Sequence, residues 1–304
     1  MGYGDRLPPW DVDNTRSRTA WRYQIFEGSK AMSDRRFRFG VVGSPATAEQ
    51  WTTTVRRAAD LGYSSVLMPD GLQLPSPFVS LAMAATLADI RVGTFVAAVP
   101  LRTPRQAAWD AHTLTLLTDG RFDFGIGTGR QGTDQQAAEL GLPFGSGKER
   151  RDQVRETLDI LERLDGDRRT PIMLAAGGPR ALALAAARAD IVSIAKDAMT
   201  PRAEILRLVQ DLRALAGPRA DSIELAMNLF AAGTRELPPW TQQAAGVTPA
   251  ELEASDSLML LRGTSHQMVD ELQRRRDEFG TSYITVNATY LEDLAPVVAK
   301  LAGS

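Results

Sequence analysis

The chain has 304 residues, of which 43% are hydrophobic, and its 35 Lys and Arg against 37 Asp and Glu leave a net charge of -2. This balance gives no electrostatic reason to expect nucleic acid or an anionic membrane as a partner, and the absence of cysteine excludes disulfides, thiolate metal sites and a cysteine nucleophile. Two histidines, His112 and His266, give little support to a metal site or a Ser-His-Asp triad. The longest apolar run, 182–189, is too short to span a bilayer. We expect a cytoplasmic protein that binds a small molecule and no metal.

The first 31 residues show neither helical nor strand periodicity and no apolar core of a signal peptide. We expect 1–31 to be an N-terminal tail. It is either disordered or docked through its aromatic side chains on the domain or on a neighbouring subunit. The remaining residues, 32–304, form the expected domain.

From Phe37 onward, short apolar strands alternate with amphipathic helices. The pattern predicts eight strands, at 37–42, 64–68, 90–99, 121–127, 171–176, 190–194, 223–232 and 282–286. Helices are predicted at 48–63, 77–88, 104–117, 149–164, directly after 177–180, and at 201–215, 265–279 and 291–301. A polar, glycine-containing stretch, 127–136, follows the fourth strand without a predicted element.

Eight strands that alternate with helices over about 250 residues are typical of a closed, parallel (β/α)8 TIM barrel. Its active site lies at the carboxyl ends of the strands. A doubly wound open sheet is the alternative, and its phosphate fingerprint G-x-G-x-x-G follows the first strand. The segment 37–45, FRFGVVGSP, lacks this fingerprint. We therefore favour the α/β TIM barrel.

The clearest candidate for anion binding follows the fifth predicted strand, where Gly177, Gly178, Pro179 and Arg180 precede an Ala/Leu helix. Glycine N–H groups and a helix N-terminus can hold a phosphate, and Arg180 can add a charged hydrogen bond. An ordinary turn between strand and helix is the alternative. Ser193 and Lys196, at the end of the next strand, add a hydroxyl and a cation.

Two further polar residues follow predicted strands. Asp70 ends the second strand, where its carboxylate would either point into the barrel mouth or cap a turn before Leu72. Arg130 lies in the polar stretch after the fourth strand, where it would either meet an anionic substrate or remain solvated. His112, inside a helix, is expected at a core or interface position.

Residues 90–130, IRVGTFVAAVPLRTPRQAAWDAHTLTLLTDGRFDFGIGTGR, resemble the core of the bacterial luciferase-like monooxygenase superfamily. The segments GGPRALALAAARADIVSI (177–194) and DELQRRRDEFGTSYITV (270–286) agree with it. The resemblance runs from about residue 37 to residue 301. Within the superfamily the chain is most similar to the coenzyme F-420-dependent oxidoreductases, which use a deazaflavin.

The resemblance implies how a cofactor would sit. The tricyclic ring would lie in the barrel mouth and its phosphate-bearing tail would reach Gly177, Gly178, Pro179 and Arg180. The family's bulge on the third strand, often with a non-prolyl cis peptide, carries over to Phe95 and Val96 behind the ring. Flavin-using luciferases tend to have arginine where this chain has Thr128, which favours coenzyme F-420 over FMN.

Two departures from the family pattern limit what the resemblance implies. Deazaflavin enzymes often carry Asp-His after the second strand, with the histidine as a base, whereas this chain reads Asp70-Gly71. The sugar-phosphate dehydrogenase branch carries glutamate where this chain has Arg130. Neither a histidine base nor oxidation of a sugar phosphate is therefore predicted.

The resemblance implies hydride transfer between the deazaflavin and a small unsaturated or carbonyl-bearing substrate. Asp70 would contact the ring, Arg130 or Thr128 would meet the substrate, and the proton donor is open. The alternatives are a reduced-FMN monooxygenase and a non-catalytic flavin-binding barrel. A barrel of the aldolase kind is disfavoured, because no lysine ends an early strand to form a Schiff base. Because relatives are often dimers, a homodimer is expected.

Overall fold

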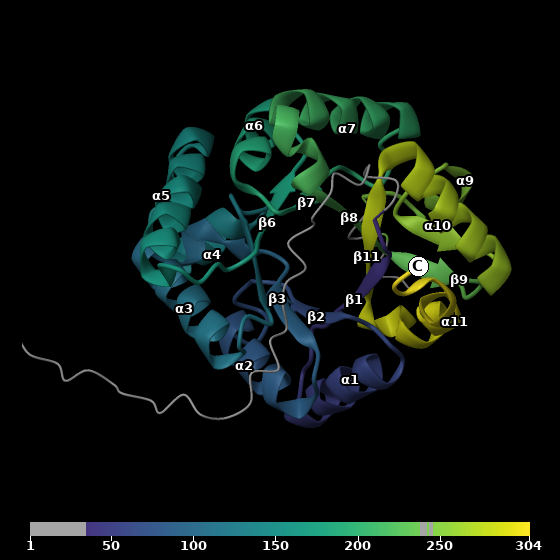
Figure 1. The fold of residues 1–304 in the computed structure, drawn as a ribbon, viewed down its shortest axis with the longest axis horizontal. Coiled ribbons are helices and arrows are strands. Elements are labelled where there is room, and N and C mark those ends of the chain that lie inside the picture. Colours follow the sequence, from purple (N-terminus) through teal and green to yellow (C-terminus); the bar gives the residue numbers. More distant parts are fainter. Residues whose placement is uncertain (1–34, 238–241, 243–245) are drawn as a thin grey trace, which may run out of the picture.

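Eight parallel strands close into a barrel that is surrounded by helices, as Figure 1 shows. The computed structural model describes residues 35–237, 242 and 246–304. The TIM barrel predicted from the sequence is confirmed. The expected tail, 1–31, lies outside the described residues.

The barrel strands follow one another in sequence order around the ring. They are β1 (Arg38–Val42), β2 (Ser65–Met68), β3 (Arg91–Thr94), β5 (Phe122–Gly127), β6 (Ile172–Ala176), β7 (Ile191–Ile194), β8 (Glu224–Leu229) and β11 (Thr281–Asn287). The ring closes where β1 pairs with β11, with Val42 opposite Asn287, and every pair is parallel. All eight carboxyl ends therefore meet at one mouth.

The helices cover the outside of this ring (Figure 1). They are α1 (Ala48–Asp60), α2 (Pro77–Leu87), α3 (Pro104–Leu117), α4 (Thr133–Glu139), α5 (Gly147–Asp165), α6 (Pro179–Arg188), α7 (Arg202–Ala216), α9 (Pro249–Ala254), α10 (Ser265–Phe279) and α11 (Leu291–Leu301). Side-chain caps fix several starts: Thr47 and Thr103 accept N–H groups of α1 and α3, and Thr264 begins α10 with a capping box. None of the described helices is long and apolar enough to cross a membrane.

Apolar side chains are buried on both faces of the strands. One cluster joins the outward-facing residues, such as Phe39 and Val41, to the helices, and a second fills the barrel with Leu67, Met173 and Tyr283 among others. Burial on both faces explains why the strands appear in the sequence as continuous apolar runs.

Two predicted strands are interrupted. The strand predicted at 90–99 divides into β3 and the short β4 (Ala97–Ala98), separated by a cis peptide bond between Phe95 and Val96. The cis bond lies at the position that the family resemblance implies.

The strand predicted at 223–232 continues past β8 into β9 (Ala231–Gly233), which pairs with β10 (Leu260–Arg262) outside the barrel. Buried Arg275 on α10 holds this small sheet, since its guanidinium donates to the carbonyl oxygens of Leu258 and Leu260 at 2.7 Å each. Neither β10 nor α9 was predicted. Helix α4, in the polar stretch after β5, was also missed.

The amino ends of the strands carry a charged network at the end of the barrel opposite the mouth. Arg38 pairs with Glu224 at 2.7 Å, and Asp123 accepts from Arg91 at 2.6 Å. Burial alone would raise the pKa of Asp123, but the nearby Arg91 and Arg38 outweigh it and hold that pKa below its usual value. The network closes the base of the barrel and lies away from the strand ends where barrel enzymes react.

Candidate active site

The mouth at the carboxyl ends of the strands brings the predicted site residues together. Asp70 follows β2, the bond between Phe95 and Val96 follows β3, and Thr128 follows β5. Gly177 follows β6, while Ser193 and Lys196 lie at the end of β7 and just beyond it. Parallel strands in a closed ring place all of these segments around one opening.

Small side chains line part of this opening. Met173 and Ile191 belong to the cluster inside the barrel, so Ala175 and Ser193, two residues farther along β6 and β7, also face inward. On β5 the corresponding position is Gly127, where an added Cβ would lie 3.0 Å from Val96 Cγ2. The inward-facing positions at this end of β5, β6 and β7 are therefore occupied by the small residues Gly127, Ala175 and Ser193.

The glycine turn between β6 and α6 has the geometry of an anion cradle. A Cβ on Gly177 would lie 1.7 Å from the Ala195 carbonyl oxygen, so only glycine fits there. Gly178 is the N-cap of α6 and offers no side-chain acceptor, which leaves the N–H groups of the first turn for a ligand. Arg180 is exposed and has no ion-pair partner among the described residues.

The two candidate residues at the end of β7, Ser193 and Lys196, differ in whether their polar groups are already hydrogen-bonded. Ser193 is 6% exposed, and its hydroxyl has no hydrogen-bond partner in the described part of the chain. Lys196 instead donates from Nζ to Glu204 Oε1 on α7 at 2.6 Å, and this bond lowers the pKa of Glu204. A phosphate near Lys196 would therefore compete with a carboxylate for the ammonium group.

Asp70 lies at the mouth, but its carboxylate is already bonded. Its Oδ2 accepts the Ala98 backbone N–H at 2.8 Å, and the Arg102 guanidinium binds both carboxylate oxygens. The Asp70 side chain is only 4% exposed. Arg102 is not among the site residues predicted from the sequence; the available signal was an arginine directly between the third strand and the next helix. Asp70 thus ties the end of β2 to the segment that follows the cis bond.

Arg130 and Thr128 lie on the loop after β5. The Arg130 N–H donates to Thr133 Oγ1 at 3.0 Å and its carbonyl accepts from the Thr133 N–H at 3.1 Å, which fixes the turn into α4. The Arg130 side chain is exposed and Thr128 is half-buried. The described residues offer the Arg130 guanidinium no carboxylate partner, so it remains available to a ligand.

The two histidines lie elsewhere. His112 Nδ1 is 2.8 Å from Asp165 Oδ1, in the interface between α3 and α5, as the sequence analysis expected. His266 is exposed at the start of α10 beside Asp270. Within the ranges that the structure describes, no three His, Cys, Asp or Glu residues are grouped to hold a metal ion.

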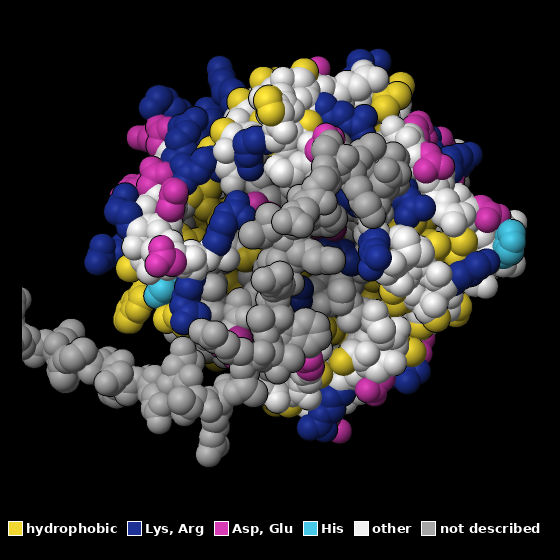
Figure 2. All heavy atoms as spheres, viewed as in Figure 1, with side chains coloured by type: hydrophobic (Ala, Val, Ile, Leu, Met, Phe, Trp, Pro, Cys, Tyr) yellow, Lys and Arg dark blue, Asp and Glu magenta, His cyan; other side chains and the backbone are white. Residues whose placement is uncertain are grey.

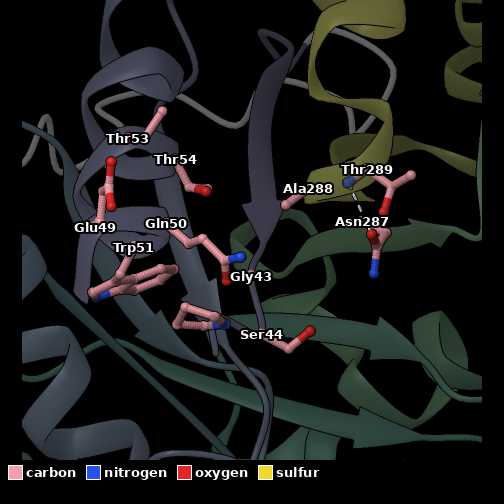
Figure 3. Close-up of a pocket in the computed structure, with 11 residues that line it drawn as sticks. Gly43, Ser44, Glu49, Gln50, Trp51, Thr53, Thr54, Asn287, Ala288 and Thr289 are labelled. Atoms are coloured by element: carbon pink, nitrogen blue, oxygen red, sulfur yellow. Dashed lines mark hydrogen bonds between the residues drawn. The ribbon is translucent and has the colours of Figure 1, made fainter. Parts of the chain in front are cut away.

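A pocket of about 410 Å³ opens beyond the carboxyl ends of β1 and β11 (Figure 3). It is bounded by the loop that starts at Gly43, by the first turns of α1 and by the turn from Asn287 to Thr289. This pocket was not predicted from the sequence, because its walls come from segments more than 200 residues apart, at 43–54 and 287–289.

Comparison with known proteins identifies the family. The family model described as luciferase-like monooxygenase matches residues 35–237. The chain belongs to the luciferase-like monooxygenase family. No curated protein matches the chain in sequence.

Solved structures share the luciferase-like barrel at low sequence identity. The coenzyme F-420-dependent tetrahydromethanopterin reductase from Methanopyrus kandleri has a TM-score of 0.69 at 17% identity, covering 88% of this chain and 100% of its own. A coenzyme F-420-dependent secondary alcohol dehydrogenase, in complex with an adduct of the cofactor and acetone, has a TM-score of 0.71 at 14% identity and covers 88% and 99%.

An FMN protein is similar to about the same degree. It is the oxygenating constituent of 3,6-diketocamphane monooxygenase from the CAM plasmid of Pseudomonas putida, a type II Baeyer-Villiger monooxygenase in complex with FMN. Its TM-score is 0.65 at 16% identity, covering 87% of this chain and 95% of its own. The luciferase-like fold is thus common to deazaflavin and flavin enzymes.

Proposed function

We propose that this luciferase-like oxidoreductase transfers hydride between coenzyme F-420 and a small unsaturated or carbonyl-bearing substrate. The observation that carries the proposal is the glycine turn before α6, with its uncapped helix N-terminus and unpaired Arg180. Thr128, in a position where flavin-using relatives tend to have arginine, favours the deazaflavin over FMN.

The residues around the mouth fit such a cofactor. Gly177, Gly178, Pro179 and Arg180 would hold its phosphate-bearing tail, and Ser193 would add a hydroxyl hydrogen bond, with Lys196 contributing if it leaves Glu204. Phe95 and Val96, which pack against the cluster inside the barrel, would support the ring from behind. When bound, a deazaflavin supplies two-electron hydride chemistry, and the protein supplies orientation and a site that excludes water.

We propose that Asp70 is a positioning residue in this site. Its carboxylate holds the Ala98 N–H and the Arg102 guanidinium, and thereby fixes the segment that begins with Phe95 and Val96. Arg130 and Thr128 would meet the substrate from the loop after β5. The Arg130 guanidinium would receive a carbonyl or carboxylate oxygen of the substrate.

We further propose that the enzyme is a homodimer that pairs through α2 and α3. These neighbouring helices expose Val79, Trp109 and Leu117, with 71%, 65% and 74% of their surfaces accessible. Figure 2 shows hydrophobic side chains at the surface along its left edge, where α3 lies in Figure 1. Exposed apolar residues that gather on two adjacent helices are typical of a protein interface.

A reduced-FMN monooxygenase is the second candidate, supported by the likeness to an FMN-containing monooxygenase. The glycine cradle would then hold the FMN phosphate. This alternative requires oxygen consumption together with a flavin reductase, whereas hydride transfer from the deazaflavin requires none. A non-catalytic flavin-binding barrel would bind the cofactor without turnover.

The deciding experiment is a fluorescence titration of the purified protein with coenzyme F-420 and with FMN. It compares the wild type with Arg180→Ala and with Arg163→Ala, whose exposed arginine lies in the last turn of α5 away from the mouth. We expect tighter binding of coenzyme F-420, weakened about tenfold by Arg180→Ala and unchanged by Arg163→Ala. A preference for FMN would instead favour the reduced-FMN monooxygenase, and oxygen uptake would then be measured next.

A further inference from the structure

The pocket beyond β1 and β11 adjoins the mouth of the barrel. Val42 and Asn287 are opposite each other at the ends of these two neighbouring strands, and the lining of the pocket begins at Gly43, directly after Val42, and at Asn287 itself. In Figure 3, Gln50 and Thr54 project from α1 on one side, and Asn287 and Thr289 lie on the other. A molecule that reacts at the mouth can therefore extend between α1 and this turn.

The walls of the pocket are held in place by long-range contacts. Arg57 on α1 binds Glu292 at the start of α11 with two hydrogen bonds, of 2.5 and 2.8 Å. Trp51 is 2% exposed, and its indole N–H donates to the Ser80 carbonyl at 2.8 Å. A Cβ on Gly43 would lie 2.4 Å from the Trp51 ring, so this glycine is needed where the loop crosses the indole. The contacts of Trp51 and Gly43 thus fix the wall that α1 and the loop after β1 form.

Six of the eleven lining residues carry uncharged hydrogen-bonding side chains, next to the apolar surface of Pro45, Trp51 and Ala288. Asn287 Oδ1 accepts the Thr289 N–H at 2.9 Å and Gln50 Oε1 accepts the Ala46 N–H at 3.0 Å. Both amide NH2 groups are left without an acceptor among the residues that the structure describes. The hydroxyls of Ser44, Thr53, Thr54 and Thr289 have no hydrogen-bond partner in the described part of the chain. Such a lining suits a ligand with several hydroxyl or carbonyl oxygens.

The only charged side chain among the eleven lining residues is Glu49, in the first turn of α1. Because no cationic side chain lines the pocket beside it, the Glu49 carboxylate repels an anionic ligand and attracts a protonated amine. The volume of the pocket lies within the range of ~300–1,000 Å³ that is common for small-molecule sites.

We propose that this pocket binds the non-reacting end of the substrate, a neutral or amine-bearing polyhydroxylated group of the sugar type. This inference depends on the proposed function in one respect, which is that the bound group is taken to be part of the oxidoreductase substrate. The binding itself requires only the walls of the pocket. It favours such groups over carboxylated and phosphorylated groups at this end of the substrate.

The test uses the full chain without cofactor and three probes of disaccharide size. Maltose is neutral, the disaccharide of glucosamine is cationic and maltobionate is anionic. Binding is measured by saturation-transfer NMR and by calorimetry. We expect the glucosamine disaccharide to bind at least as tightly as maltose, and maltobionate to bind at least tenfold more weakly than either.

Substitutions on α1 test whether the disaccharides bind in this pocket. Thr54→Val removes a hydroxyl that lines it, whereas Thr52→Val, on the same helix, removes one that donates to the Ala48 carbonyl at 2.8 Å. We expect Thr54→Val to weaken maltose binding about threefold to tenfold and Thr52→Val to leave it unchanged. Glu49→Gln should remove the difference between the glucosamine disaccharide and maltose.

Three results would overturn the proposal: no binding of either non-anionic disaccharide, equal binding of maltobionate, or an equal effect of the two threonine variants. Because no cofactor is present, these results are independent of the titration with coenzyme F-420 and FMN. If the protein binds the sugars but prefers FMN, the assignment of coenzyme F-420 is refuted and the proposed sugar site is retained. If the protein binds coenzyme F-420 but none of the sugars, only the proposed sugar site is refuted.

Discussion

Arg102 binds both carboxylate oxygens of Asp70, with Nη1 2.5 Å from Oδ2 and Nη2 3.0 Å from Oδ1, in a pair that is 12% and 4% exposed. The same carboxylate accepts the Ala98 backbone N–H. One ion pair therefore fixes the end of β2 against the chain that follows the cis bond between Phe95 and Val96. Asp70, which the family resemblance suggests as a ring contact, thus also holds the segment after the cis bond in place.

Replacing Asp70 by asparagine should lower the free energy of unfolding by about 3 kcal/mol, because Arg102 would keep a buried charge without its partner. Asp89→Asn is the control, since the Asp89 side chain is 73% exposed and lies 3.6 Å from Arg121. The control should change stability by less than about 0.5 kcal/mol. Urea unfolding followed by circular dichroism measures both. Equal effects of the two variants would show that the Asp70 pair has no special structural part.

Gly177→Ala should be destabilising by about 2 kcal/mol, because the new Cβ would fall 1.7 Å from the Ala195 carbonyl oxygen and the backbone would have to shift. Gly178→Ala, one residue later, places its Cβ in open space at a φ of -128° that any residue adopts. It should change stability by less than about 0.5 kcal/mol. Thermal unfolding of the two variants separates a glycine required by close packing from one that is merely tolerated. The reverse order of stability would contradict this description of the turn.

The charged network at the base of the barrel should make stability depend on pH through Asp123. Arg91 and Arg38 outweigh the effect of burial and lower the pKa of this carboxyl in the folded protein. Its contribution is therefore present above the unfolded pKa of about 3.9 and is lost as the pH falls through the lower folded value. Asp123→Asn should cost about 3 kcal/mol at neutral pH and should flatten the loss of stability in acid.

Urea unfolding at a series of pH values measures this dependence. The control is Asp211→Asn, which changes an exposed carboxylate on α7 and should keep the acid dependence of the wild type. If the curves of Asp123→Asn and wild type stayed parallel in acid, Asp123 would not be the group that titrates.

The proposed dimer predicts a mass of twice the chain's 33.1 kDa in sedimentation or light scattering. Leu117→Asp places a charge in the exposed face of α2 and α3 and should shift the protein to monomer. Leu215→Asp is the matched control, because Leu215 is 54% exposed on α7, outside this face. A monomeric wild type, or a dimer that survives Leu117→Asp, would exclude this face as the interface.

Local sequence patterns determined most of the elements. Helices α3, α10 and α11 have the bounds that apolar spacing and capping residues predict. The reason is that a helix is specified by residues three and four apart and by a cap at its start, all of which lie within one short segment. The alternation of strand and helix then restricts the fold to few architectures, of which the closed barrel is one.

The elements outside this alternation were not predictable in the same way. Strands β9 and β10 are three residues each and pair across a separation of about 30 residues. Strands this short give no period to detect, and their stability comes from Arg275 and the neighbouring helices. The interruption of the strand predicted at 90–99 is likewise invisible to periodicity, and only the family resemblance indicated it.

The sequence by itself determined the barrel, the glycine turn before α6 and the set of polar residues that follow the strands. Only the tertiary structure decided which of them are free, since Asp70 pairs with Arg102 and Lys196 pairs with Glu204, whereas Arg180 stays unpaired within the described chain. The pocket beside the mouth likewise exists only because the first and last strands close the ring and bring Gln50 and Asn287 to opposite walls. Local backbone preferences depend on neighbours a few residues away, whereas ion pairs and pocket walls depend on contacts that form only when distant segments meet.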